Sequence, residues 1–219
     1  MATLADGELH VWIADLDASG SATGRSRRQD LLSQDERERA ARFWHRRDGE
    51  RWARSHALLR SLLGSYLGTD PAGLCFEYGQ WGKPRLAGEH TRLRFNMSHS
   101  GRLALYAFAL DFELGIDVET AGGARYVPAV AERAFGADVR RRLEQLDESN
   151  REHEFLRLWV RHEARLKCWE TGLGGARSAG DRECWTIDVD ADLGEWAAAA
   201  AAAPCAPAKV ECWRLRAVL

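Results

Sequence analysis

The sequence has very little lysine and almost no net charge. Only three of its 31 lysines and arginines are lysine (Lys83, Lys167 and Lys209), and the formal net charge is −2. Proteins that bind nucleic acid over a broad surface carry an excess of positive charge, so this balance argues against a nucleic-acid partner. In a chain that uses arginine almost everywhere, each lysine is notable, because lysine is a compact charge that can readily release a proton.

Cysteine motifs and long apolar runs are also missing. The five cysteines include no CxxC pair, so a structural zinc site is not expected. No apolar stretch reaches membrane-spanning length without a charge, and residues 1–12 lack the basic and apolar regions of a signal peptide. We therefore expect a cytoplasmic protein with free thiols and no membrane partner.

What is present predicts an α+β fold of two similar halves, residues 1–110 and 111–219. Both halves follow the order strand, helix, long helix and strand pair, without clear residue identity between them. Strands are expected at 8–16, 74–78, 93–110 (a hairpin), 112–119, 184–189 and 209–218, and helices at 33–44, 49–68, 128–135, 137–146 and 150–171. The alanine run 197–203 fits either a short helix or a loop.

Local signals refine three of these elements. Ser33 and Glu36 have the spacing of a capping box that opens the first helix, which is expected to run to about Trp44. Asp48 is a candidate cap for the second helix. The polar residues Ser98–Gly101 are expected to form the turn of the 93–110 hairpin.

A pair of acids ends the expected strand at 112–119. Asp117 and Glu119 are two residues apart, so their side chains point to the same side and repel each other. Two solvated carboxylates at a strand end would be the simple interpretation. A third carboxylate brought in from a helix would instead create an oxygen-rich site suited to Mg²⁺, which binds phosphate oxygens and retains waters.

The long helix can supply that carboxylate. Glu163 and Lys167 are four residues apart and share a helix face. On spacing alone, an ordinary helix-stabilising ion pair worth a few tenths of a kcal/mol is the simpler interpretation. Together with the strand-end acids, the same pair could serve a metal-assisted phosphate site.

Cations and hydroxyls elsewhere could hold the phosphates. Lys83 lies in a GKP turn, and the SHSG segment presents Ser98 and His99, which can donate hydrogen bonds. Arginines also cluster over two helical segments, at Arg39, Arg42, Arg46, Arg47 and Arg51. A plain polar turn and a solvated helix face are the alternatives, but the combination indicates a Mg²⁺-assisted site for a polyphosphate.

Five segments occur in a characteristic order: DERERAARFWHRRDGERWARSHALLRSLL, YGQWGKPRL, FNMSHSGRLALYAF, LGIDVE and LWVRHEARLKCWETGLG. This set resembles the 4'-phosphopantetheinyl transferases of the surfactin-synthetase type over residues 30–175. The resemblance implies two similar α+β halves with the active site in the cleft between them. It also implies transfer of 4'-phosphopantetheine from coenzyme A to a serine hydroxyl of an acyl or peptidyl carrier protein, with Mg²⁺, releasing 3',5'-ADP.

The resemblance also assigns residue roles. Asp117, Glu119 and Glu163 resemble the metal ligands, and Glu163 and Lys167 resemble the catalytic residues. Lys167 would contact phosphate as well. The remaining coenzyme A contacts are expected at Arg39, Arg51, Lys83, Pro84, Ser98 and His99. Glu163 is the candidate base for the serine hydroxyl, directly or through a water, with Lys167 assisting.

One departure leaves an alternative open. The family's helix motif has lysine before the glutamate, whereas this chain has His162. His162 lies on the apolar stripe of its helix, where a packed histidine is expected, but it could instead face the pyrophosphate. The alternative function is a catalytically weak relative that binds coenzyme A or a carrier protein without modifying it. The resemblance further implies a monomer whose carrier contacts include residues 168–180.

Overall fold

The computed structural model describes residues 3–18, 30–88, 92–120, 125–170, 184–190 and 197–215. Its strands are β1 (Glu8–Asp15), β2 (Phe76–Tyr78), β3 (Pro84–Leu86), β4 (Leu93–Ser100), β5 (Leu103–Leu110), β6 (Gly115–Thr120), β7 (Trp185–Asp188), β8 (Ala197–Ala203) and β9 (Lys209–Leu215). Its helices are α2 (Gln34–Ala41), α3 (Arg46–Leu67), the 3-10 turn η1 (Pro71–Gly73), α4 (Pro128–Phe135), α5 (Ala137–Glu144) and α6 (Glu148–Trp169).

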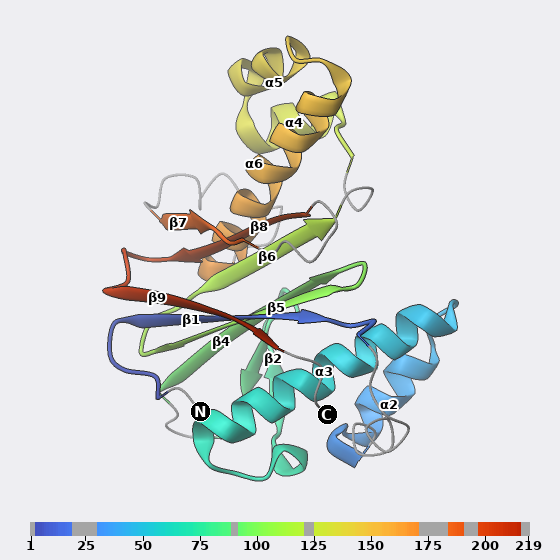
Figure 1. Cartoon of the computed structure of the whole chain (residues 1–219), viewed down its shortest axis with the longest axis vertical. Coiled ribbons are helices and arrows are strands. Elements are labelled where there is room, and N and C mark those ends of the chain that lie inside the picture. The colour runs from blue at the N-terminus through green and yellow to red at the C-terminus, as the bar shows by residue number, and fades with distance from the viewer. Residues whose placement is uncertain are drawn as a thin grey trace.

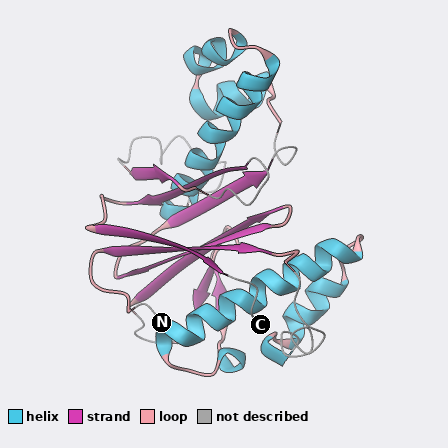
Figure 2. Cartoon of the chain, viewed as in Figure 1, coloured by secondary structure: helices cyan, strands magenta, loops and turns pink. Residues whose placement is uncertain are grey.

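Two sheets pack face to face, and each carries one long helix on its outer face (Figures 1 and 2). The first sheet has the order β4-β5-β1-β9 and the second β6-β8-β7. Their inner faces share an apolar core that includes Leu105 and Ile116. Helices α3 and α6, each 22 residues long, cover the outer faces of the first and second sheets. This repeated arrangement confirms the predicted α+β fold of two similar halves.

The last strand crosses from the second half into the first sheet. β9 pairs in parallel with β1, and Val11 lies opposite Cys212 in this ladder. β1 is antiparallel to β5 on its other side. The sheet of the first half is therefore completed by residues 209–215.

The alanine run forms a strand, so neither a helix nor a loop was the right expectation. β8 lies between β6 and β7, and all but the first of its seven alanines are buried. Ala198, Ala200 and Ala202 face α6, whereas Ala199 and Ala201 face the first sheet. Alanine favours helices intrinsically, but its small side chain allows close layers on both faces of a central strand.

The helix boundaries also differ from some expectations. The capping box is confirmed: the Glu36 amide donates to Ser33 Oγ at 3.2 Å, and the Ser33 amide donates to Glu36 Oε2 at 2.8 Å. α2 ends at Ala41, before Trp44. α3 begins at Arg46 with His45 as its N-cap residue, so the prediction that Asp48 caps it was wrong. Asp48 lies in the first turn instead, where its charge suits the helix dipole.

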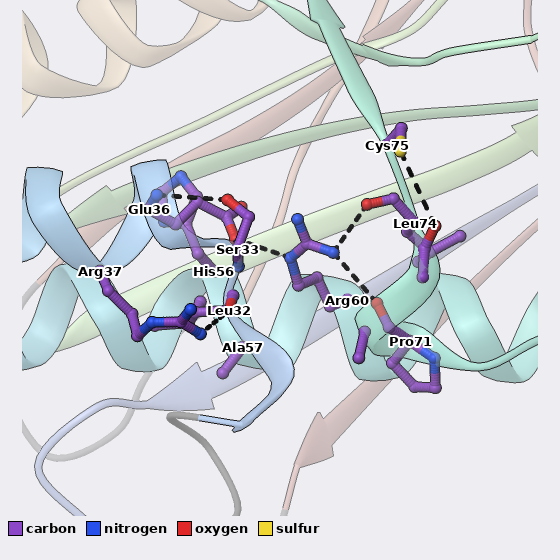
Figure 3. Close-up of polar contacts among 12 residues, drawn as sticks. Leu32, Ser33, Glu36, Arg37, His56, Ala57, Arg60, Pro71, Leu74 and Cys75 are labelled. Carbon is purple, nitrogen blue, oxygen red and sulfur yellow. Dashed lines mark hydrogen bonds and ion pairs between the residues drawn. The ribbon is translucent and has the colours of Figure 1, made fainter.

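A buried ion pair joins α2 to α3 (Figure 3). Arg60 donates from Nε to Glu36 Oε2 at 2.7 Å, and from Nη1 to the carbonyls of Pro71 at 3.1 Å and Leu74 at 2.8 Å. The guanidinium also lies 4.9 Å from the centre of the Phe76 ring. One arginine thus fixes α2, α3 and the entry to β2 relative to one another.

Candidate active site

Polar side chains of β4 meet the acids of β6 where the two halves face each other. Ser98 Oγ donates to Asp117 Oδ1 at 2.8 Å, and Ser100 Oγ donates to Glu119 Oε2 at 2.8 Å. Both pairs follow the two-residue period of a strand, so alternate residues of β4 reach alternate residues of β6. The predicted hairpin is confirmed, because β4 and β5 are antiparallel neighbours. Its turn is shorter than predicted: Gly101 lies in the turn, whereas Ser98, His99 and Ser100 belong to β4.

Lys167 from α6 completes this cluster. Its Nζ donates to Asp117 Oδ1 at 2.6 Å, to Ser98 Oγ at 3.1 Å and to the Ile116 carbonyl at 3.3 Å. The ammonium therefore compensates one of the two strand-end acids. Three segments meet at this point: Ser98 and Asp117 are 19 residues apart in the chain, and Lys167 follows them by 69 and 50 residues.

The helix reaches the strand because β6 begins with glycine. A Cβ at Gly115 would clash with the carbonyl of Ala164 and would lie 2.6 Å from the backbone nitrogen of Cys168. Only glycine lets the helix backbone approach the strand this closely. This contact determines how closely α6, which carries Glu163 and Lys167, approaches Asp117 on β6.

Glu163 lies one helical turn before Lys167 and has an unsatisfied oxygen. Its Oε1 is buried and has no hydrogen-bond partner among the described residues, and the same holds for Asp117 Oδ2. Burial and the nearby negative charge of Asp117 raise the pKa of Glu163. Burial is also the largest influence that raises the pKa of Glu119, opposed by the hydrogen bond from Ser100.

These carboxylates suit a hard cation although they do not yet surround one. Among the described residues, no three His, Cys, Asp or Glu side chains form a ready metal-ligand cluster. Lys167 lies against Asp117 instead. Burying a carboxylate oxygen without a partner costs free energy. A divalent cation would satisfy these oxygens, and oxygen atoms are the ligands that Mg²⁺ prefers.

The residues predicted to contact phosphate differ in their exposure and in their hydrogen-bond partners. His99 lies exposed on β4. The Lys83 side chain is 8% exposed, and its Nζ donates to Glu113 Oε2, the Leu114 carbonyl and the Lys167 carbonyl, each at 3.0 or 3.1 Å. Lys83 thus joins the GKP turn to the end of α6.

Pro84 begins β3 and lines a pocket of about 380 Å³ beside Lys83 and Arg94. A second pocket, of about 330 Å³, is lined by Arg39, whose guanidinium lies 5.3 Å from the centre of the Trp52 ring. Arg51 Nε donates a hydrogen bond to Asp17 Oδ1 at 2.8 Å, and this bond holds the pKa of Asp17 well below its usual range. A phosphate at Arg51 would have to compete with Asp17.

His162 packs among aromatic side chains. Its ring meets the ring of Phe135 edge-on at 5.6 Å, and burial is the main reason that its pKa is lowered. These contacts favour the packed histidine over a pyrophosphate ligand.

Sequence reasoning missed Ser100 and Glu113. The alternation of Asn96, Ser98 and Ser100 could have indicated the first of them, because it places three polar groups on one face of a strand. Asn96 follows the same pattern: its Oδ1 accepts from the Ile116 amide at 2.9 Å. Of the predicted carrier contacts at 168–180, residues 171–180 lie outside the described residues.

Two family models match most of the chain between them. Residues 23–110 match the family described as 4'-phosphopantetheinyl transferase, N-terminal, and residues 113–214 match the 4'-phosphopantetheinyl transferase superfamily. The chain is 35% identical over 176 residues to the 4'-phosphopantetheinyl transferase HetI of Nostoc sp., and the alignment covers 78% of this chain and 72% of the relative.

Relatives in Bacillus subtilis agree. A 4'-phosphopantetheinyl transferase of that organism is 30% identical over 162 residues, and the transferase Sfp is 28% identical over 158 residues; each alignment covers 72% of this chain and 69% of the relative. The chain belongs to the 4'-phosphopantetheinyl transferase family, which confirms the resemblance seen in its motifs. It is an enzyme of the transferase class.

Proposed function

We propose that the chain transfers 4'-phosphopantetheine from coenzyme A to a serine hydroxyl of an acyl or peptidyl carrier protein, releasing 3',5'-ADP. The observation that carries this proposal is the cluster of Ser98, Asp117 and Lys167, with Glu163 one helical turn away. It combines carboxylate oxygens that lack partners with a fixed ammonium. Phosphoryl-type transfer depends mainly on such positioning and charge.

Asp117, Glu119 and Glu163 would hold Mg²⁺. When bound, the ion supplies positive charge to the pyrophosphate oxygens on which negative charge develops. Lys167 can then contact phosphate, because the site no longer needs its ammonium to compensate Asp117. The finding that supports this assignment is the pair of buried oxygens Asp117 Oδ2 and Glu163 Oε1, which lack partners among the described residues.

Glu163 is proposed to take the proton of the carrier serine, directly or through one water. It stands on α6 next to the helix turn that carries Lys167, so base and cation approach the same reacting group. Ser98 and Ser100 orient Asp117 and Glu119 through their hydrogen bonds. Lys83, Pro84, His99, Arg39 and Arg51 are the proposed contacts to the rest of coenzyme A.

We further propose a cytoplasmic monomer that uses no nucleic-acid or membrane partner. Helix α6 is long, but none of the helices in the described part of the chain has both the length and the apolar character that a bilayer crossing requires. The two halves supply both sides of the site in one chain, as the hydrogen bond from Lys167 to Ser98 illustrates.

The test is to incubate the protein with coenzyme A, Mg²⁺ and an apo carrier protein and to weigh the carrier by mass spectrometry. We expect one phosphopantetheine adduct that disappears with EDTA and in Glu163→Gln. Glu154→Gln is the matched control, since the Glu154 side chain is 44% exposed and pairs with Arg157 on the same helix. No adduct on several acyl and peptidyl carriers, despite measurable coenzyme A binding, would favour the non-catalytic relative.

A further inference from the structure

Two cysteines meet at the end of the helix that carries Glu163 and Lys167. Cys168 lies in the last turn of α6 and is 1% exposed, and Cys184 packs against the same apolar cluster just before β7. Cys168 Sγ lies 3.6 Å from the Glu113 carbonyl oxygen, and Cys184 Sγ lies 3.2 Å from that of Ala203. The remaining cysteines, Cys75, Cys205 and Cys212, are exposed single thiols.

Both thiols lie at the same edge of the second sheet. The carbonyls that they contact, those of Glu113 and Ala203, flank the paired residues Gly115 of β6 and Ala202 of β8. The two thiols are not equivalent: interaction with Cys168 lowers the pKa of Cys184, whereas interaction with Cys184, together with burial, raises the pKa of Cys168. Cys184 is also the more accessible of the two, being half-buried. Since the thiolate is the nucleophile in disulfide exchange, Cys184 is suited to react first with a reagent from solution, and Cys168 is suited to react second.

We infer that Cys168 and Cys184 form a reversible intramolecular disulfide, made by exchange with a small-molecule disulfide. The Cys184 thiolate attacks one sulfur of the reagent, which gives a mixed disulfide and releases one thiolate. Cys168 then loses its proton and attacks Cys184 Sγ, which expels the second thiolate of the reagent. Two protein thiols are oxidised and one reagent disulfide is reduced to two thiols.

The bond would tie the end of α6 to β7. Cys168 follows Lys167 directly, and the Lys167 carbonyl accepts a hydrogen bond from Lys83 at 3.1 Å. The cross-link would therefore restrain the helix turn whose side chain reaches Asp117. Its formation rests on the positions of the two sulfurs and does not depend on the proposed transfer reaction.

The experiment uses a protein in which Cys75→Ser, Cys205→Ser and Cys212→Ser leave only the pair. After equilibration in glutathione buffers of increasing oxidised fraction, free thiols are blocked with N-ethylmaleimide and the intact protein is weighed. We expect two maleimides under reducing conditions, and none under oxidising conditions with a mass two hydrogens lower. Maleimide should label Cys184 about tenfold faster than Cys168, as expected for a lower pKa and better access.

Single variants separate the two roles. On the same background, Cys168→Ser should accumulate a glutathione adduct on Cys184, whereas Cys184→Ser should leave Cys168 largely unmodified. Peptide mapping of the unaltered chain for a cross-link between Cys168 and Cys184 makes the result independent of how the variants fold. Two maleimides at every glutathione ratio, or a stable glutathione adduct without the cross-linked peptide, would overturn the inference.

Discussion

Lys167 Nζ lies 2.6 Å from Asp117 Oδ1, so the acid proposed to bind metal is held by an ammonium group. The Asp117 side chain is 6% exposed, and the Lys167 side chain is 29% exposed. Removing one partner of a buried pair leaves the other charge without compensation. In this site, lysine and metal would compete for one carboxylate, and that competition can be measured without an assay of the transferase reaction.

Lys167→Met tests this competition. The variant should be less stable than the unaltered protein by about 3 kcal/mol, because Asp117 keeps its burial and loses its cation. Mg²⁺ should then raise its melting temperature by more than it raises that of the unaltered protein. Differential scanning calorimetry with and without Mg²⁺ gives both values.

Lys209→Met is the matched control, because Lys209 pairs with Glu211 at an exposed edge far in sequence from these acids. Its response to Mg²⁺ should equal that of the unaltered protein. If Mg²⁺ changes the melting temperature of none of the three proteins, the carboxylates do not form the proposed site.

Gly115→Ala should destabilise the protein by more than about 2 kcal/mol and reduce transfer together with stability. The added methyl group would collide with the Ala164 carbonyl, and relief requires α6 to move away from β6. Glu163 and Lys167 would move with it. Urea unfolding measures the first effect, and carrier modification at a temperature where the variant is folded measures the second.

Gly73→Ala provides the comparison. A Cβ at Gly73 has nothing within 4 Å, and the residue ends a short 3-10 turn. We expect its stability to lie within about 0.5 kcal/mol of the unaltered protein, which is typical of surface substitutions. Equal losses in the two glycine variants would refute the role given to close helix approach.

His56 should make stability depend on pH. Burial lowers its pKa from 6.5 to about 3, against the opposing hydrogen bond to the Trp52 carbonyl. Between these values the unfolded chain takes up a proton that the folded protein does not, so stability falls as the pH drops from 6.5 toward 3. The limiting slope from this one group is about 1.4 kcal/mol per pH unit.

The measurement compares urea unfolding of the unaltered protein, His56→Gln and the control His45→Gln across this pH range. His45 is exposed and makes no capping hydrogen bond through its side chain. His56→Gln should reduce the pH dependence of the free energy of unfolding by the amount expected for uptake of one proton. His45→Gln should show the same pH dependence as the unaltered protein. A slope that is the same in all three proteins would place the proton uptake elsewhere.

Local sequence signals predicted the elements whose own residues determine them. The capping box at Ser33 and Glu36 and the helix Pro128–Phe135 could be predicted because their patterns are complete within one turn or one helix. The strand of alanines could not, because its conformation is decided by its neighbours β6 and β7 and by the approach of α6.

In the site, too, some features could be predicted from local sequence and others could not. The spacing of Asp117 and Glu119 correctly indicated two acids on one face of a strand, where Ser98 and Ser100 both reach them. The partners of Lys83 could not be read from spacing, because they lie 30 to 84 residues away in the chain. Such contacts depend on how the two halves pack, which no short window of sequence contains.

The parallel pairing of β9 with β1 has a consequence for the order of folding during synthesis. Glu8 pairs with Lys209, so one edge of β1 stays open until residues 209–215 have left the ribosome. Closing this ladder brings together residues about two hundred positions apart, which is among the slowest kinds of contact to form. The sheet of the amino-terminal half is therefore complete only once β9 has been made, and until then the open edge of β1 can pair with other chains.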